Sequence, residues 1–297
     1  MLKAALITLL ILTLLALAST WYLATHVLPY AIIQPGNKSG SKTPADFGMA
    51  YEHLRLQATD SIELDAFYIP STTTPKANLV ILHGVGSCKE VYLGTAERLC
   101  AMGYNLYLLD QRAHGKSGGK FLTYGYHEKE DISKVLDWLE TKSPGIKIGI
   151  YGNSMGAAIA LQSIAHDGRL TFGLIESTFT DLPSVAHAYG QRLSGISLPA
   201  FLTNYVLRQS GKLADFDPWT VRPIETVTKI TVPIQFIHGD ADQNINVSNG
   251  HALYAACASA DKALYIVKGG DHADLWDKGG KAYEAAWFGF LGRMVSE

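Results

Sequence analysis

Short apolar runs alternate with stretches of helical periodicity along most of the chain. Residues 51–56 and 62–69 predict an opening antiparallel pair, because the second run alternates in polarity. Six later runs are almost entirely apolar, as is typical of buried parallel strands, and they lie at residues 78–83, 105–110, 146–151, 172–176, 234–238 and 263–267. Between them, apolar residues recur every three or four positions at residues 89–102, 128–140, 155–166, 247–258 and 281–295. This alternation predicts an α/β fold, a mostly parallel sheet with helices on both faces.

One interval between predicted strands is too long for a simple connection. Between residues 176 and 234 no convincing strand occurs, and apolar residues such as Leu198, Phe201 and Tyr205 fall at helical spacing. We predict a small helical cap at residues 181–230, inserted after the sixth strand over the carboxyl ends of the strands, where open α/β sheets bind their ligands. The alternative is a helical layer that only completes the core.

The beginning of the chain has a different composition. Residues 4–37 contain no Lys, Arg, Asp or Glu. As a helix, residues 4–28 measure about 37 Å at roughly 1.5 Å per residue, which is enough to cross a hydrocarbon core of about 30 Å. We therefore predict an N-terminal transmembrane anchor or signal segment at residues 1–33. Residues 34–44, rich in Gly, Ser and Lys, predict a linker to a folded body at residues 45–297.

Two other interpretations of this segment stay open. In a cleaved signal peptide, Lys3 is the charged start and Ala16-Leu17-Ala18 the cleavage site; a buried helix is the third. Apolar residues resume after Thr20 and continue to Leu28, which favours an uncleaved anchor. An anchor holds the rest of the chain at a membrane, with the body on the extracytoplasmic side, whereas cleavage makes it secreted or periplasmic.

Composition and charge exclude several classes of protein. The 297 residues carry 25 Lys plus Arg against 27 Asp plus Glu, and 47% are hydrophobic, which excludes a disordered chain. A net charge of −2 without a basic block excludes a typical nucleic-acid binder. None of the three cysteines, Cys88, Cys100 and Cys257, lies in a C-x-x-C pair or beside His at metal-ligand spacing. We predict neither a metal site nor a disulfide framework.

A nucleophile motif follows the predicted strand at residues 146–151. Residues 152–156 read Gly-Asn-Ser-Met-Gly and open the helix predicted at residues 155–166. A nucleophile on a tight strand-to-helix turn needs small neighbours two positions away on each side, and the glycines provide them. Ser154 is therefore the candidate nucleophile, and an ordinary helix N-cap is the alternative.

A serine hydroxyl needs a base and an orienting carboxylate. His272 follows the last predicted strand and is the candidate base. Asp242, on the loop after the penultimate strand, is the first choice for the carboxylate. Asp240, Glu176 and Asp181 are the alternatives.

Backbone N–H groups must meet the negative oxygen that forms during acyl transfer. Met155, which follows the candidate nucleophile, supplies one such donor. The second is expected in residues 83–86, His-Gly-Val-Gly, where glycines let the backbone approach a ligand. We choose Val85, and a plain turn is the alternative.

Four motifs together carry a resemblance to a known family. They are residues 83–86, 110–118 and 152–156, and the Asp242 loop with His272. The chain from about residue 51 to 290 resembles the α/β-hydrolase superfamily, in its serine esterase and lipase-like branch, near monoacylglycerol lipases and small bacterial esterases. The resemblance implies Ser154 as nucleophile, His272 as base, Asp242 as orienting acid, and Val85 and Met155 as oxyanion donors. It implies structural roles for Asp110 and Arg112.

These observations predict a membrane-associated serine hydrolase that cleaves carboxylic esters through an acyl-enzyme on Ser154. Its substrate would be a small ester or a lipid-like molecule, and no metal or organic cofactor is implied. A peptidase, amidase or thioesterase with the same triad is the alternative, and an acid in the cap poised for a substrate amine, such as Asp181, Asp215 or Asp217, would favour an aminopeptidase. A non-catalytic binding module is the third hypothesis.

Overall fold

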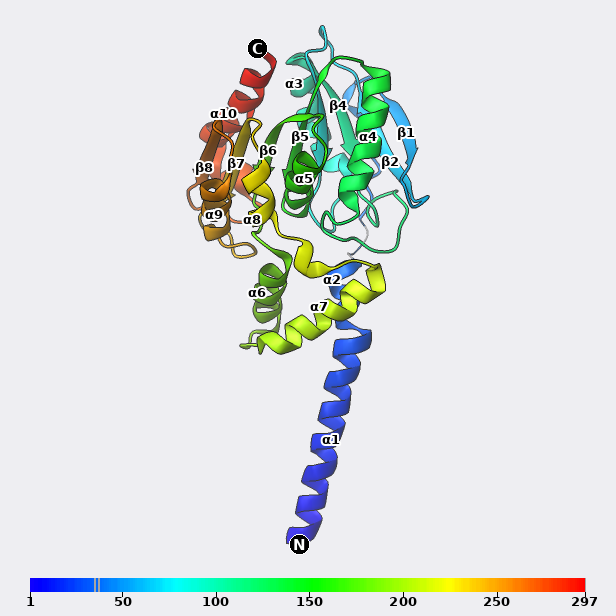
Figure 1. Cartoon of the computed structure of the whole chain (residues 1–297), viewed down its shortest axis with the longest axis vertical. Helices are drawn as coiled ribbons and strands as arrows, with labels where there is room; N and C mark the ends of the chain where they lie inside the picture. The colour runs from blue at the N-terminus through cyan, green and yellow to red at the C-terminus, as the bar shows by residue number, and fades with distance from the viewer. Residues whose placement is uncertain (35, 37, 297) are drawn as a thin grey trace.

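The computed structural model of the chain describes residues 1–34, 36 and 38–296. Residues 35 and 37 of the predicted linker at 34–44 lie outside the described residues. One sheet holds the strands (Figure 1), which are β1 (Glu52–Gln57), β2 (Glu63–Ile69), β3 (Ala77–Leu82), β4 (Tyr104–Leu109), β5 (Lys147–Asn153), β6 (Leu170–Glu176), β7 (Ile234–Gly239) and β8 (Lys262–Val267). These are the strands that the apolar runs predicted, shifted by at most two residues at either end.

The sheet is mostly parallel, as predicted. Its order is β1-β2-β4-β3-β5-β6-β7-β8, and among the described residues only the β1–β2 and β2–β4 pairs are antiparallel. The register aligns Leu82 with Gly152, and Asn153 with Glu176. The loops that leave β3, β5 and β6 therefore start side by side at one edge of the sheet.

Helices cover both faces of this sheet. The α-helices are α1 (Leu2–His26), α2 (Leu28–Ile33), α3 (Leu93–Ala101), α4 (Glu128–Lys142), α5 (Met155–His166), α6 (Leu182–Ser194), α7 (Ala200–Ala214), α8 (Pro223–Thr226), α9 (Ser248–Ala256) and α10 (Leu275–Ser296). The short 3-10 helices are η1 (Pro44–Phe47), η2 (Lys89–Tyr92), η3 (Pro218–Thr220) and η4 (Val227–Lys229).

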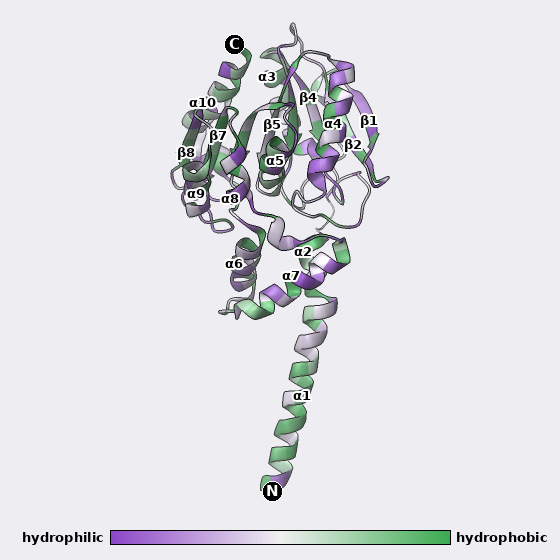
Figure 2. Cartoon of the chain, in the orientation of Figure 1, coloured by the Kyte–Doolittle hydropathy of each residue, from purple (hydrophilic) through white to green (hydrophobic). Residues whose placement is uncertain are grey.

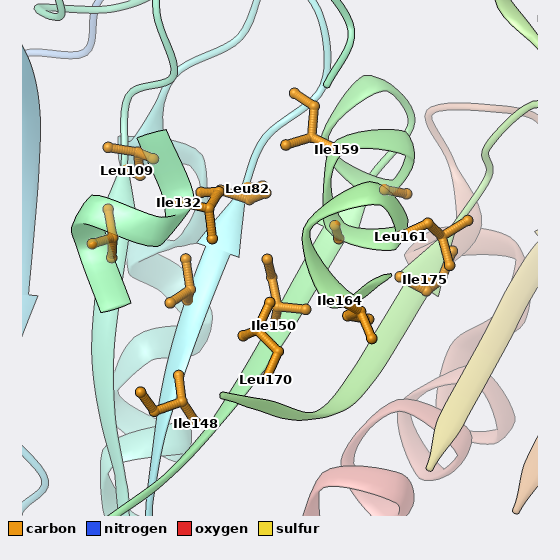
Figure 3. Close-up of a cluster of buried hydrophobic side chains, with 14 of the residues drawn as sticks. Leu82, Leu109, Ile132, Ile148, Ile150, Ile159, Leu161, Ile164, Leu170 and Ile175 are labelled. Atoms are coloured by element: carbon orange, nitrogen blue, oxygen red, sulfur yellow. The ribbon is translucent and has the colours of Figure 1, made fainter. Parts of the chain in front are cut away.

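Two buried clusters fill the space between the sheet and its helices. On one face, side chains of α4, α5, η4 and α9 pack on the sheet, and Figure 3 shows part of this cluster around Ile150, Ile159 and Ile175. On the other face, α3 and α10 bury Leu99, Trp287 and Leu291 against the strands. Helix α5 follows the central strand β5 and is buried from Met155 to Ile164. Its sequence is therefore mostly apolar around the whole helix rather than on one face.

Two helices differ from their predicted bounds by more than two residues. The helix predicted at residues 89–102 starts as the 3-10 helix η2, because the Lys89 side chain turns inward to buried carboxylates. The helix predicted at 281–295 extends back to Leu275 as α10, with a break at Gly280, where φ is 49°. Gly279 and Gly280 interrupt the apolar periodicity, so the sequence pattern does not predict the turn that precedes them.

Helices α1, α2, α6 and α7 lie together at the end of the molecule where the parallel strands finish (Figure 1). Helix α1 extends away from the body, and Figure 2 shows that it is apolar over most of its length. Residues 2–33 are long and apolar enough to cross a membrane, by length and composition. Residues 2–23 are exposed, and burial against the body begins at Ala24. The short α2 belongs to the body, because its Ile33 is fully buried among α7 and loop side chains.

Candidate active site

Ser154 lies on a strained turn between β5 and α5. Its backbone has φ 54° and ψ −116°, an uncommon conformation for a residue with a side chain. A Cβ on Gly152 would lie 2.3 Å from the carbonyl oxygen of Gly156, and a Cβ on Gly156 would lie 2.5 Å from that of Leu82. The N–H of Ser154 donates to the carbonyl of Glu176 at 2.8 Å. The two glycines and the neighbouring strand thus hold the serine at the sheet edge.

A chain of hydrogen bonds joins three of the predicted residues. The Oγ of Ser154 lies 2.9 Å from Nε2 of His272, and Nδ1 of His272 lies 2.7 Å from Oδ2 of Asp242. A carboxylate only accepts, so Nδ1–H donates to Asp242, and in the neutral ring Nε2 is left to accept the serine proton. Ser154 is 7% exposed and Asp242 is 6% exposed, so little water screens these hydrogen bonds. The geometry suits proton transfer from the serine to the histidine.

Asp242 is held as an anion by several donors. Its Oδ1 accepts from the N–H groups of Asn244 and Ile245, both at 2.8 Å. Burial opposes ionisation, but hydrogen bonds from His238 and His272 outweigh it and hold the pKa of the Asp242 carboxyl well below its usual range.

His238 is a second histidine on this carboxylate, and sequence reasoning missed it. It is buried, its Nε2 donates to the carbonyl of Ile245 at 2.7 Å, and the same nitrogen lies 3.4 Å from Oδ2 of Asp242. The available signal was its place at the end of β7, four residues before Asp242. That spacing does not show that the loop after β7 folds back over the ring of His238.

Two other carboxylates fasten the loops that carry the acid and the base. Asp240 accepts from the N–H of Gly269 at 2.6 Å, and Asp271 accepts from the N–H of Gln243 at 2.9 Å. Each bond joins the loop after β7 to the loop after β8. Asp240, an alternative for the orienting acid, therefore binds loop backbone rather than His272.

The remaining alternatives also have other partners. Glu176 is buried and accepts from the Nδ2 of Asn153 at 2.8 Å and from the hydroxyl of Tyr283. Burial raises the pKa of the Glu176 carboxyl, although these hydrogen bonds oppose the change. Asp181 caps α6 by accepting from the N–H of Ser184. Both carboxylates are thus used within the scaffold.

The loop after β3 lies against the candidate nucleophile. A Cβ on Gly84 would lie 3.4 Å from the Cβ of Ser154. His83 accepts from the N–H of Gln111 through Nε2 at 3.2 Å, so its Nδ1–H donates to the carbonyl of Gly84 at 2.8 Å. Burial lowers the pKa of His83 to about 4, which keeps the ring neutral for this pairing. The ring therefore fixes the direction of the Gly84 peptide.

The N–H groups of Val85 and Met155 flank this contact. Met155 is the first residue of α5, where helix N–H groups lack partners within the helix. Over residues 1–34, 36 and 38–296, neither N–H donates to a protein acceptor. Both remain available to an oxygen atom near Ser154, and the amino end of α5 favours negative charge there.

The motif at residues 110–118 supplies no member of the Ser154, His272 and Asp242 hydrogen-bonded chain, and its contacts support the scaffold, including the loop of His83. Asp110 accepts from the buried Lys89 ammonium at 2.5 Å, and Arg112 forms a two-point pair with Asp131 at 2.6 and 2.7 Å. A surface hollow beside Arg112 contains no residue of the Ser154, His272 and Asp242 chain.

Known proteins are similar to the chain over most of its length. A sequence model of the family described as serine aminopeptidase, S33, matches residues 73–200. The uncharacterized protein YqkD of Bacillus subtilis is 32% identical, over 82% of this chain and 84% of that protein. Human monoglyceride lipase is 25% identical, over 80% of this chain and 88% of the lipase.

A solved structure agrees with these sequence relatives. An esterase of Pyrococcus furiosus superposes with a TM-score of 0.74 at 25% identity, over 88% of this chain and 98% of the esterase. The order of strands, the turn at Ser154 and the similarity to these proteins lead to one conclusion. The chain belongs to the α/β-hydrolase superfamily.

Proposed function

We propose that the chain is a serine hydrolase that cleaves carboxylic esters through an acyl-enzyme on Ser154. The observation that carries this proposal is the hydrogen-bonded chain from Ser154 through His272 to Asp242, with bonds of 2.9 and 2.7 Å. Similarity to an esterase and to a monoglyceride lipase supports an ester as the substrate.

Each residue has a defined part in the proposed reaction. Ser154 Oγ attacks the acyl carbon while His272 Nε2 takes its proton, and Asp242 stabilises the resulting imidazolium. The N–H groups of Val85 and Met155 bind the negative oxygen of the tetrahedral intermediate. His272 then gives its proton to the leaving alcohol, and a water molecule, deprotonated by the same ring, releases the acid.

An amide or thioester is the second candidate substrate, because the matching family model is described as a serine aminopeptidase. An aminopeptidase needs an acid for the substrate amine. Asp181 and Asp217 instead accept from backbone N–H groups that start helical turns, and residues 182–214 contain no Asp or Glu. Asp215 ends α7 and lies beside a hollow away from Ser154. These placements favour the ester.

The domain plan belongs to the same proposal. Of residues 1–33, α1 holds the enzyme at a membrane while α2 packs on the body; residues 34–44 form the linker, and residues 45–297 form the hydrolase domain, with residues 181–230 as its cap. Exposure of residues 2–23 outside the body supports the anchor. We propose the extracytoplasmic side for the body. Cleavage after Ala18 would remove residues 1–18 and leave α2 in place. A mass measurement of the mature chain therefore separates the uncleaved anchor from the cleaved signal peptide.

Hydrolysis of matched substrates tests the function. The full-length protein and its Ser154→Ala variant receive p-nitrophenyl esters from acetate to palmitate, together with the corresponding p-nitroanilides. We expect ester hydrolysis with a chain-length optimum, lost in Ser154→Ala, and slow or no anilide hydrolysis. Faster hydrolysis of the anilides than of the esters would overturn the ester assignment and leave the nucleophile assignment intact.

A further inference from the structure

The α6–α7 hairpin, residues 182–214, exposes large apolar side chains at its turn. Leu193 is 68% exposed, Ile196 63% and Phe201 76%. Beyond residue 28, five of the nine large apolar side chains that are exposed in the described chain lie in this hairpin, the other two being Tyr189 and Leu213. Such a concentration on a single hairpin is typical of an interaction surface rather than of scattered surface residues.

The hairpin lies where the apolar helix α1 leaves the body. Thr25 Oγ1 of α1 is 3.0 Å from the hydroxyl of Tyr205 in α7, and the Ser210 hydroxyl donates to the carbonyl of Pro29 at 3.2 Å. Phe201 precedes Tyr205 by four residues, so both lie on one face of α7, a single helical turn apart. The exposed turn of the hairpin is therefore close to the level at which α1 emerges (Figure 1).

The exposed length of α1 shows where the hairpin turn lies relative to a bilayer. Residues 4–23 are uncharged and exposed. As a helix they rise about 30 Å, the thickness of a hydrocarbon core. Trp21 and Tyr22, both exposed, lie at the body end of this stretch, where aromatic side chains mark the boundary between lipid and water. A bilayer crossed by residues 4–23 thus ends next to the hairpin.

The charge of the hairpin suits a lipid surface. None of the 27 Asp and Glu residues of the chain falls in residues 182–214. Its charged side chains are Arg192, Arg208 and Lys212; all are exposed, and among the described residues none of them pairs with a carboxylate. Basic side chains beside exposed apolar ones are the combination that binds anionic lipid surfaces.

We propose that the α6–α7 hairpin rests on the membrane that α1 crosses, with Leu193, Ile196 and Phe201 in the apolar boundary of a leaflet that contains anionic lipid. The inference builds on the proposed anchor and hydrolase. It also names the substrate class. Strand β6 ends at Glu176, beside Ser154, and α6 starts only six residues later, so a hairpin that rests on the membrane keeps Ser154 near the lipid. The edge of the sheet that holds Ser154 then faces the lipid, and the enzyme takes acyl esters from the bilayer.

Depth measurements on the full-length protein test the proposal. Single cysteines replace Leu193, Ile196 or Phe201 and carry an environment-sensitive fluorophore, and the native cysteines need no removal because all three are buried. The matched control is Val91→Cys, an apolar side chain that is 58% exposed on η2. The proteins are reconstituted into phosphatidylcholine vesicles with or without phosphatidylglycerol, and the quencher is a nitroxide on the lipid acyl chain.

We expect blue-shifted, strongly quenched emission from the three hairpin sites, more so with phosphatidylglycerol, and neither effect at position 91. Hairpin labels that behave like the label at position 91 would overturn the proposal, and so would protein that fails to float with the vesicles. Labelling of Ser154 by a fluorophosphonate in the same samples reports the proposed hydrolase separately, because it requires no lipid contact.

A kinetic measurement adds a functional readout. Leu193→Ser with Phe201→Ser removes two apolar side chains from the proposed lipid contact. We expect the KM for a vesicle-borne long-chain ester to rise at least about tenfold, because the partition preference of even one Leu or Phe side chain is about that large. The Val91→Ser control retains the original KM. An unchanged KM in the double variant would contradict the delivery of substrate from the bilayer.

Discussion

Asp242 is the residue on which the proposed chemistry depends most, because it contacts two histidines at once. His272 binds one oxygen directly, and His238 approaches the same oxygen while it holds the loop carbonyl of Ile245. The low pKa of the Asp242 carboxyl reflects both rings, which overcome its burial. The orientation of the base thus depends on a residue that never contacts Ser154.

We expect His238→Leu to lower kcat about tenfold, since a hydrogen bond to a charged group contributes about 1.5 to 3 kcal/mol. With one donor lost, the pKa of the Asp242 carboxyl rises. His238→Gln keeps an N–H donor and is expected to recover most of kcat. A kcat that falls equally in both variants would refute a positioning role.

Glu176 makes the second prediction at this scale. Burial raises its pKa above the ordinary 4.5, so the folded protein binds more protons than the unfolded chain once the pH exceeds that value. The free energy of unfolding therefore decreases as the pH rises from about 4.5 through the folded-state pKa. Glu176→Gln cannot titrate. Urea unfolding at several pH values should show the wild type losing stability relative to this variant, whereas parallel curves would contradict the argument.

The residues of the candidate site that lie in short sequence motifs could be predicted from the sequence. Ser154, Asp242 and His272 each follow a predicted strand, and parallel strands bring their carboxyl ends to one edge, which predicts that the three residues lie together. The partners of Glu176 and the ring of His238 could not be predicted. They depend on which way a loop or a helix folds back, and Tyr283 meets Glu176 across 107 residues of sequence.

At the scale of elements, the turn between β5 and α5 works because two glycines allow backbone to approach backbone. The pair Gly152 and Gly156 lies on either side of Ser154, and a Cβ at either position would meet main-chain atoms that cannot move aside. The positive φ of Ser154 is stable only because this close packing holds it.

Gly156→Ala is therefore expected to destabilise the fold by about 1 to 3 kcal/mol, the usual result of overpacking. The matched control is Gly289→Ala in α10, where a Cβ meets nothing within 4 Å. Alanine there is expected to stabilise the helix by up to about 1 kcal/mol. Urea midpoints measure both. Equal stability of the two variants would contradict the steric account of the turn.

The elements that sequence periodicity predicted best are those with one uniform environment. Helix α5 has the predicted bounds, residues 155–166, because a glycine motif starts it and its residues 155–164 are all buried. The start of α10 could not be predicted, since Gly279 and Gly280 look like a loop. Likewise, no local signal shows that Lys89 turns into the core and tightens the backbone of η2.

At the scale of the whole molecule, the segment at residues 1–33 divides into two parts. Residues 2–23 are exposed, whereas α2 supplies the buried Ile33, whose carbonyl accepts from the N–H of Leu122 at 2.9 Å. Composition alone could not separate the parts, because both are apolar. Their difference arises from contact with α7 and the loop before α4.

Two truncations test this division. A chain that starts at residue 24 should fold, retain ester hydrolysis on a soluble substrate and no longer float with vesicles. A chain that starts at residue 35 loses α2, and we expect it to be less stable by at least about 2 kcal/mol, as for other large losses of buried apolar side chains. Thermal unfolding and vesicle flotation measure the two effects. Equal stability of both truncated chains would show that α2 is not part of the body.

Covalent labelling tests the central claim most directly. The full-length protein is treated with a fluorophosphonate, digested and mapped by mass spectrometry, in parallel with Ser154→Ala and His272→Ala. We predict one adduct, on Ser154, with no adduct and no ester hydrolysis in Ser154→Ala and greatly slowed labelling in His272→Ala. An adduct on another residue, or ester hydrolysis that survives in Ser154→Ala, would contradict the assignment of Ser154 as the nucleophile.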